Sequence, residues 1–238
     1  MKALASYWNS KAEAYAKRVE TLTATPNHKE LWAVLLSKLL GVKSGLELLD
    51  IGTGTGFLAL QLAALGHRVT GIDFSEEMLF IARAKAKETG HACSFLKGDA
   101  EDMPFPDDNY DIIVCRHVLW GLACPDCALA EWHRVLKPGG KIIIMDGDWK
   151  ARNVDPIFRS AAAMGRIRLG GVQPKAWKKR KSEHTEKSRL DPEKQLFKLL
   201  SDSGFRDIAS HHPAAIFERK TSDLLLEQFQ RIWITALK

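Results

Sequence analysis

The segment Leu48–Leu60, which reads LLDIGTGTGFLAL, constrains the fold of this chain more than any other. An apolar run leads through the acid Asp50 into three glycines, and a second apolar stretch with Ala and Leu at helical spacing follows at once. This pattern predicts a buried strand, a tight turn and a helix. Glycine tolerates positive φ and lets a ligand approach the backbone, and a helix N-terminus offers unpaired N–H groups. We therefore expect an adenine nucleotide or nucleoside at this turn.

The spacing of the glycines excludes two common nucleotide-binding motifs, the dinucleotide fingerprint and the P-loop. The third glycine of Gly52-Thr-Gly54-Thr-Gly56 comes one residue too early for a dinucleotide fingerprint, and no Gly-Lys-Ser/Thr follows as in a P-loop. Two acids close the next two predicted strands: Asp73 can accept from both hydroxyls of a ribose, and Asp99 can accept from an adenine amine. Because the carboxyl ends of parallel strands border one crevice, the glycines and both acids should converge.

Strands and helices alternate regularly through the middle of the chain, which predicts an α/β fold with a doubly wound parallel sheet. The pattern predicts strands at Leu46–Ile51, Arg68–Ile72, Cys93–Lys97, Tyr110–Cys115 and Lys141–Met145, and helices at Phe57–Leu65, Ser75–Thr89 and Asp126–Val135. Lys-Pro-Gly-Gly, residues 137–140, is expected as the exit loop of the third of these helices.

We expect a single domain over residues 1–238, made of four parts: a helical cap (1–45), a core (46–148), an insertion (149–190) and a C-terminal part (191–238). The cap should hold two helices, the second at His28–Leu40. The insertion should hold a helix at 156–169 and then a mobile loop. After it we expect a helix at Pro192–Ser203, strands at Phe205–His211 and 214–218, and an amphipathic helix at Asp223–Leu237.

The net charge of +6 is concentrated in one segment. Residues 149–198 hold 14 Lys/Arg against 5 Asp/Glu, whereas the rest of the chain holds 21 against 24. A solvated, mobile loop is one interpretation of this excess, and a surface that meets an anionic or polar substrate is the other.

The four cysteines are too few and too scattered for a disulfide framework. Cys124 and Cys127 form a lone CxxC, which we interpret as two ordinary cysteines near a helix start, and we expect no metal site. The N-terminus lacks an apolar signal region and no apolar run is long enough to cross a bilayer, so the chain is expected to be cytoplasmic.

Four motifs in order give the chain a resemblance to the class I S-adenosylmethionine-dependent methyltransferases. They are DIGTGTGFLAL, GIDFSEEML, GDAEDMPFPDDNYDIIV and RVLKPGGKIIIMD, spread over residues 46–146. The chain is similar to the small-molecule branch called type 11 and, through the N-terminal YWNSKAEAYAKR, to the ubiquinone and menaquinone methyltransferases. The resemblance implies a Rossmann-like, mostly parallel seven-stranded sheet, with S-adenosylmethionine as cofactor and S-adenosylhomocysteine as product.

The resemblance also implies roles for individual residues. The glycines would pass under the methionyl part and ribose, Asp50 would help to hold the ammonium, and Arg116 and His117 would face the methyl group. The cofactor-binding residues would be Asp50, Gly52, Thr53, Gly54, Gly56, Asp73, Phe74, Ser75, Met78, Asp99, Ala100 and Arg116. Candidate catalytic residues are His117, Asp146 and Tyr15, with Asp148 as a further base, and candidates for the substrate pocket are Tyr7, Trp120 and Trp149.

The acceptor is expected to be a small molecule, which receives the methyl group by in-line displacement. An RNA-modifying enzyme that uses residues 149–190 on phosphates is the alternative, although no Asn/Asp-Pro-Pro-Tyr/Phe motif is present. A non-catalytic scaffold that keeps the fold is another, and a homodimer is one option for the assembly.

Overall fold

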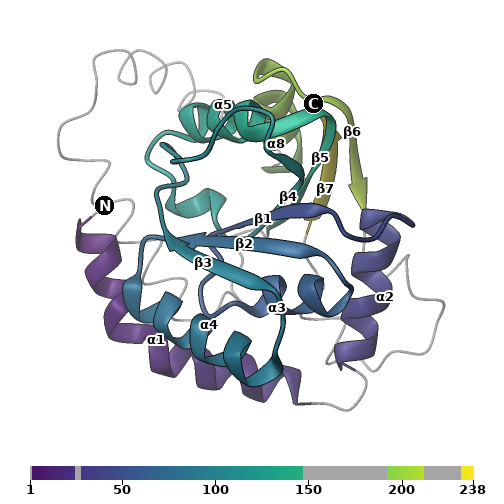
Figure 1. The fold of residues 1–238 in the computed structure, drawn as a ribbon. Helices are drawn as coiled ribbons and strands as arrows, with labels where there is room; N and C mark the ends of the chain where they lie inside the picture. The colour runs from purple at the N-terminus through teal and green to yellow at the C-terminus, as the bar shows by residue number, and fades with distance from the viewer. Residues whose placement is uncertain (1, 25–27, 147–191, 212–231) are drawn as a thin grey trace.

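The computed structural model describes residues 2–24, 28–146, 192–211 and 232–238, which form one seven-stranded sheet with helices on both faces (Figure 1). The strands are β1 (Glu47–Ile51), β2 (Arg68–Asp73), β3 (Cys93–Lys97), β4 (Tyr110–Arg116), β5 (Leu136–Asp146), β6 (Arg206–His211) and β7 (Ile232–Leu237). The helices are α1 (Lys2–Thr23), α2 (His28–Leu40), α3 (Phe57–Ala64), α4 (Glu76–Thr89), the 3-10 turn η1 (Leu119–Gly121), α5 (Pro125–Val135) and α8 (Pro192–Asp202).

The sheet has the order β3-β2-β1-β4-β5-β7-β6. The first five strands pair in parallel, and β7 is antiparallel to both of its neighbours. This arrangement confirms the predicted α/β fold and its mostly parallel seven-stranded sheet. Ile51 lies between Ile72 of β2 and Cys115 of β4, so these strands end at one edge of the sheet. The turns that follow them must therefore meet there.

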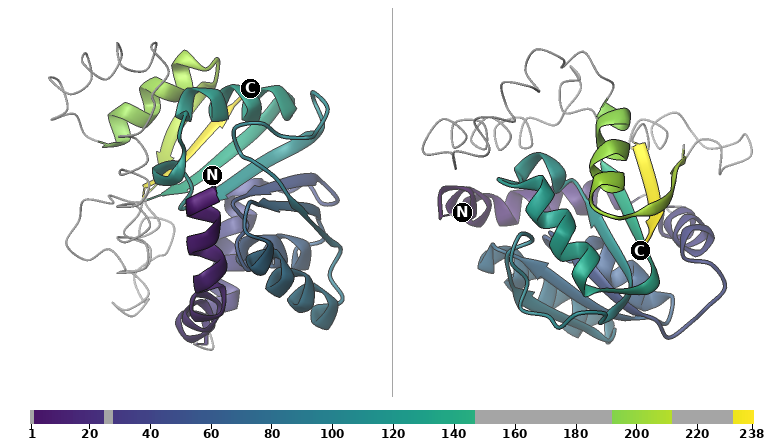
Figure 2. Two further views of the ribbon diagram at one scale, coloured as in Figure 1. Left: turned by 90° about the vertical axis from the view of Figure 1, so that its left-hand side faces the viewer. Right: turned by 90° about the horizontal axis from the view of Figure 1, so that it is seen from above.

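Helices α2, α3 and α4 cover one face of the sheet, and α5 and α8 cover the other (Figures 1 and 2). Two buried clusters correspond to these faces, one around Leu36 and Leu62 and one around Leu129 and Trp132. Residues 142–146 of β5 are all buried, as expected for a central strand that is covered on both sides. Among the described residues, no helix is both long and apolar enough to cross a bilayer.

Helix α1 lies beside α4 and forms a small third cluster with it, in which Leu4, Trp8 and Ala12 pack against Met78. Two polar contacts add to this packing: Ser75 donates to Asn9 Oδ1 at 2.7 Å, and Lys85 pairs with Glu20 at 2.9 Å. These contacts hold α1 beside the edge of the sheet at which β2 ends.

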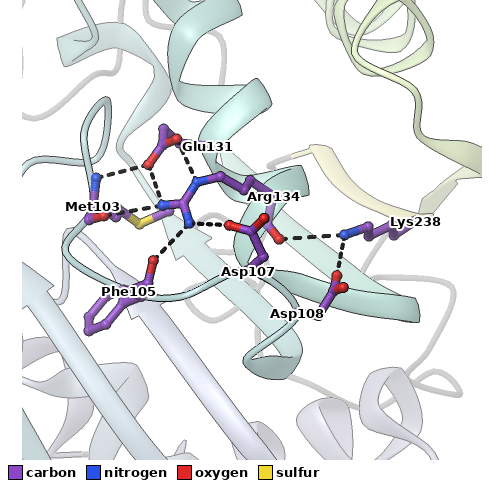
Figure 3. A network of polar contacts seen from close by, with 7 residues as sticks. All are labelled: Met103, Phe105, Asp107, Asp108, Glu131, Arg134 and Lys238. Carbon is purple, nitrogen blue, oxygen red and sulfur yellow. Dashed lines mark hydrogen bonds and ion pairs between the residues drawn. The ribbon is translucent and has the colours of Figure 1, made fainter.

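Arg134 of α5 organises the long connection between β3 and β4 (Figure 3). Its guanidinium donates to the carbonyl oxygens of Met103 and Phe105, and it pairs with Asp107 and Glu131 at 2.7 and 2.8 Å. Because the planar guanidinium carries five donors, one arginine can hold several points of a loop. The connection, which begins after Lys97 and contains Asp99, is thereby tied to helix α5.

The predicted C-terminal helix is wrong where the structure describes it. Residues 232–237 form strand β7, in which Trp233 pairs with Met145 of β5 and with His211 of β6. The segment IWITAL is short, apolar and rich in β-branched residues, so its pattern fits a buried strand as well as one face of a helix. Pairing with two neighbours decides between them.

Two smaller predictions are also corrected. Residues 137–140 belong to β5, which begins at Leu136 opposite Tyr110 and has an irregular register there, so they are not only a helix exit. Cys124 and Cys127 form a disulfide at the start of α5, so they are not two independent cysteines. The predicted helix at 156–169, the strand at 214–218 and the whole insertion lie outside the described residues.

We expect Trp233→Ala to lower the free energy of unfolding by about 3–5 kcal/mol, because its side chain is buried and stacks on Trp32 with ring centroids 5.5 Å apart. Urea denaturation would measure the loss. Val42→Ala, at a fully exposed position, should change the value by less than about 0.5 kcal/mol. Equal, small effects of the two substitutions would contradict the placement of β7.

Candidate active site

The turn between β1 and α3 depends on glycine at two positions. Gly52 has φ 63°, and a Cβ there would lie 2.5 Å from Val118 Cγ2. Gly56, the N-cap of α3, has φ 79°, and a Cβ there would lie 3.1 Å from that of Ala82. L side chains rarely adopt these φ values, and the space for a Cβ is absent. The missing Cβ of Gly52 leaves the backbone bare beside Val118 in the cavity, whereas the missing Cβ of Gly56 allows the turn to pack closely against Ala82 and Phe95.

Asp50 is buried directly beneath this turn. Its Oδ2 accepts from the hydroxyl of Thr53 at 2.7 Å and from the N–H of Ala59 at 3.2 Å. Burial raises the pKa of Asp50 to about 7, and the Thr53 hydroxyl, the Ala59 N–H and the charge of Arg116 oppose that effect. Its contacts brace the turn against the start of α3.

Asp73, the last residue of β2, joins the turn to helix α4. Its Oδ2 accepts from Gly54 N–H at 2.9 Å, and its Oδ1 accepts from Ser75 N–H at 2.8 Å. Burial raises the pKa of Asp73 to about 6, although the N–H groups of Ser75, Gly54 and Phe74 favour the charged form. Each carboxylate oxygen has a second lone pair, so Asp73 can still accept from a ligand hydroxyl.

Ser75 begins α4 as the sequence predicts. Its side chain accepts from Met78 N–H at 3.3 Å, and Glu76 and Glu77 occupy the first turn of the helix. This cap leaves Phe74 and Met78 at the edge of the sheet, beside Asp73.

His117 follows β4 with φ 62°, an uncommon conformation for a residue that is not glycine. Its N–H donates to Met145 O at 3.1 Å, and its Nδ1 lies 4.0 Å from Asp146 Oδ1. Asp146 Oδ2 accepts from Leu119 N–H at 3.2 Å. Both side chains are buried, so the strained backbone turns an imidazole towards the carboxyl edge of the sheet with a carboxylate behind it.

One cavity, with about 800 Å³ of space partly open to solvent, gathers most of these residues. Ten of the predicted site residues line it: Tyr15, Gly52, Gly54, Asp73, Phe74, Met78, Asp99, Ala100, Arg116 and His117. Asp50, Thr53, Gly56, Ser75 and Asp146 stand behind its wall, and Tyr7 packs edge-on against Trp8, outside the lining. The backbone of Trp120 lies in η1. Asp148 and Trp149 lie outside the described residues.

The cavity also contains residues that the sequence analysis did not select. Leu4 and Trp8 reach it from α1, Glu101 from the loop after β3, and Val118, Gly121 and Leu122 from the segment around η1. Glu101 accepts from the N–H groups of Ala123 and Cys124, which joins two walls of the cavity. The proximity of Glu101 to Asp99 was a usable signal. The helical spacing of Trp8, Ala12 and Val19, which are all buried, indicates the inward face of α1, but it does not indicate which cavity that face meets.

The residues present fit a nucleoside sulfonium with an amino-acid end. The glycine turn has no Cβ at the positions where one would fill the cradle, and Asp73 offers carboxylate oxygens beside it. Apolar side chains of Phe74, Met78 and Val118 line the cavity nearby. Among the described residues, no group of three or more His, Cys, Asp or Glu side chains could hold a metal ion.

Comparisons with known proteins agree with this fit. The profile of a family described as "Methyltransferase domain" matches residues 49–144. A demethylmenaquinone methyltransferase of Staphylococcus saprophyticus is 30% identical over 198 residues, which cover 80% of this chain and 83% of the relative. Another, from Tropheryma whipplei, is 38% identical over 128 residues, which are 54% of this chain and 53% of the relative. The chain thus aligns with about half the length of that second relative.

Among solved structures, phosphoethanolamine N-methyltransferase 2 of Haemonchus contortus, in complex with S-adenosyl-L-methionine, shares the fold. Its TM-score is 0.60 at 21% identity, over 88% of this chain and 52% of that one. The chain belongs to the class I S-adenosylmethionine-dependent methyltransferases. Within that class it is a member of the type 11 branch, as the glycine turn and its matched residues predict.

Asp50 should make stability depend on pH in a specific direction. Its pKa is about 7 in the folded protein against 3.8 for an unperturbed group, so between these values the native state binds more protons than the unfolded state. The free energy of unfolding therefore falls as pH rises through that window. Asp50→Asn keeps an oxygen acceptor for Thr53 and Ala59 but has no such titration.

We expect the stability of Asp50→Asn relative to the natural protein to increase from pH 5 to pH 7, by at most about 1.4 kcal/mol per pH unit. Urea midpoints of both proteins at pH 5, 6, 7 and 8 would measure this. If the difference in free energy of unfolding between the two proteins stays constant from pH 5 to pH 8, the Asp50 carboxyl group does not titrate in this window.

Proposed function

We propose that the protein transfers a methyl group from S-adenosylmethionine to a ring carbon of a small hydroquinone. The observation that carries this proposal is that the bare glycine turn, Asp73 and His117 meet apolar side chains in one cavity. The names of the demethylmenaquinone methyltransferases among its relatives support the choice of acceptor.

The cofactor, when bound, supplies a methyl group activated on a sulfonium. Asp73 would accept from the ribose hydroxyls, and Asp99 and Ala100 would contact the adenine edge between Phe74 and Met78. Gly52 and Gly54 would allow the methionyl part to lie against the backbone. These residues orient the donor and exclude water, and orientation contributes a large share of the acceleration in such displacements.

The acceptor would enter beside His117, where Trp8, Leu4 and Leu122 provide apolar walls. An aromatic ring buries well against such walls, whereas a phosphate backbone does not. The basic segment 149–198 would serve a polar or anionic part of the acceptor, as its charge suggests.

A hydroquinone carbon becomes a good nucleophile when a neighbouring hydroxyl loses its proton. We infer that His117 takes that proton and that Asp146, whose Oδ1 lies 4.0 Å from His117 Nδ1, stabilises the resulting imidazolium. The ring carbon would form its bond to the methyl group while the bond from the methyl group to sulfur breaks and leaves its electron pair on sulfur. The proton on that carbon would then pass to solvent to restore the aromatic ring, and the imidazolium of His117 would return its proton to the ring oxygen.

Asp73→Asn should weaken the binding of S-adenosylhomocysteine by about 10- to 100-fold, because a hydrogen bond to a charged acceptor is worth roughly 1.5–3 kcal/mol. Isothermal titration calorimetry on the full chain would measure it. Glu77→Gln, at an exposed position on α4, is the matched control and should bind as the natural protein does. Binding by Asp73→Asn that equals the control would contradict the cofactor site.

His117→Asn should lower kcat by about 10²- to 10⁴-fold, because asparagine has no basic group in this pH range. Asparagine readily adopts positive φ, so the backbone can keep its conformation. The measurement uses methyl-labelled cofactor with a reduced demethylnaphthoquinone, and S-adenosylhomocysteine affinity should stay within about threefold. An unchanged kcat would remove His117 as the base. If the methyl label appears in bulk RNA and not in the quinol, and if this labelling depends steeply on salt concentration, the proposal of a hydroquinone acceptor is overturned.

A further inference from the structure

Cys124 and Cys127 form a disulfide across the first turn of α5, and the proposed methyl transfer uses neither of them. Their Cα atoms lie 5.2 Å apart at a sequence separation of 3. Cys127 is exposed and Cys124 is half-buried, whereas the two free cysteines, Cys93 and Cys115, are half-buried and buried. The disulfide therefore lies where a thiol from solvent can reach it.

The start of α5 treats the two sulfur atoms differently. Cys124 is the N-cap of this 11-residue helix, and its Sγ accepts from Cys127 N–H at 3.2 Å. The N-terminus of a helix presents unpaired N–H groups and the positive end of the helix dipole, and both favour a negative charge at the cap. A thiolate on Cys124 would therefore be stabilised, and a stabilised thiolate is a good leaving group in thiol–disulfide exchange. Cys127 is then the sulfur that an incoming thiolate attacks.

Glu101 connects the disulfide with the wall of the cavity. Its carboxylate accepts from the N–H groups of Ala123 at 2.6 Å and Cys124 at 3.2 Å. Its own N–H donates to Asp99 Oδ1 at 3.1 Å. Glu101 and Asp99 line the cavity, and so does Leu122, two residues before Cys124. Hydrogen bonds thus run from the disulfide to the acid that we propose for the adenine edge.

Opening the disulfide would change this wall in two ways. It removes the covalent tie between Cys124 and the first turn of α5, so the segment before the helix gains conformational freedom. It also replaces a neutral sulfur with a thiolate on the residue whose N–H group Glu101 holds, and two like charges repel each other. Both changes weaken the hold of Glu101 on Ala123 and Cys124. The oxidised protein should therefore have the firmer cavity wall.

We propose that the bond between Cys124 and Cys127 is a redox-active disulfide that exchanges with thiol reductants, and that its reduction weakens cofactor binding in the cavity. The thiolate of an external thiol attacks Cys127 Sγ, and the electron pair of the broken S–S bond passes to Cys124 Sγ. A second thiolate then attacks the reductant's sulfur in this mixed disulfide and frees Cys127. The two external thiols leave joined as a disulfide, so they lose the two electrons that the cysteine pair gains. Their two protons pass to solvent and to the Cys127 thiolate.

Alkylation under native conditions tests the exchange. The full chain is equilibrated with reduced and oxidised glutathione in a series of ratios, and the free thiols are then alkylated and located by mass spectrometry. We expect Cys124 and Cys127 to become labelled together and reversibly in the folded protein, whereas structural disulfides resist this thiol couple. If the pair is labelled only in denaturant, or does not reoxidise, the inference is overturned.

The coupling to the cavity has a readout of its own. Calorimetry should show that the reduced protein binds S-adenosylhomocysteine about three- to tenfold more weakly than the oxidised protein. Because such coupling is reciprocal, saturating S-adenosylhomocysteine should raise the ratio of squared reduced to oxidised glutathione at half-reduction by the same factor. A disulfide that only staples α5 would give equal affinities and no shift, and that result would overturn the inference.

Two variants separate this pair from the other cysteines. The double variant Cys124→Ser/Cys127→Ser keeps a capping hydroxyl at the start of α5 but cannot form the bond, so it should bind S-adenosylhomocysteine as the reduced protein does, whatever the glutathione ratio. Cys93→Ser is the matched control, because Cys93 is a free cysteine of β3, and it should keep the full response. A glutathione response that persists in the double variant would contradict the assignment. If the double variant folds poorly, the reciprocal shift in the natural protein still decides.

Neither the exchange nor its coupling depends on which acceptor the protein methylates. A hydroquinone that takes no methyl label would therefore overturn the proposed function and leave the disulfide site standing. Absence of S-adenosylhomocysteine binding by the oxidised natural protein would overturn both the cofactor site and the coupling.

Discussion

The two hydrogen bonds accepted by Asp73 hold together the parts on which this site depends. One comes from Gly54 in the turn after β1, and the other comes from Ser75 at the start of α4. A single carboxylate at the end of β2 thus ties a loop, a strand and a helix, and it does so where burial raises its pKa to about 6. The N–H donors only partly offset the desolvation of this half-buried carboxylate, so it retains a strong tendency to accept further hydrogen bonds. A site for the hydroxyl groups of a ribose requires this property.

The remaining walls follow from the geometry of the sheet edge. Parallel pairing brings the ends of β1, β2 and β4 side by side, so the glycine turn, Asp73 and Arg116 lie within one cavity. Helix α1 then closes one side of that cavity through Leu4 and Trp8, held by Met78 and by the contact of Ser75 with Asn9. The side of the cavity that we propose for the cofactor is therefore built at the ends of strands, whereas the closing side is a helix that packs as a separate cluster.

Local patterns in the sequence were enough to predict the strands and helices around the proposed cofactor site. The bounds of α2 and β3 agree with those predicted, and Ser75 caps α4 as expected. Capping residues, glycines and the spacing of apolar residues are local signals, because each involves residues only a few positions apart in the chain. The convergence of Gly54, Asp73 and Asp99 also followed from strand order alone. The same reasoning failed for β7, because the apolar residues of Ile232–Leu237 fit the spacing of a buried strand as well as that of a helix. It also failed for the disulfide between Cys124 and Cys127, which depends on how the two side chains meet at the start of α5.

The sequence by itself determined the class of ligand site, since the glycine spacing and the two strand-end acids leave little else that the turn could hold. Only the tertiary structure decided which other side chains share that site. Leu4 and Trp8 enter from a helix distant in sequence, Glu101 bridges two loops, and Arg116 rests on Phe57. Such contacts depend on where α1 docks and on the packing of aromatic rings between elements. The helical spacing of Leu4, Trp8 and Ala12 shows which face of α1 is buried, but no local pattern shows which element that face meets.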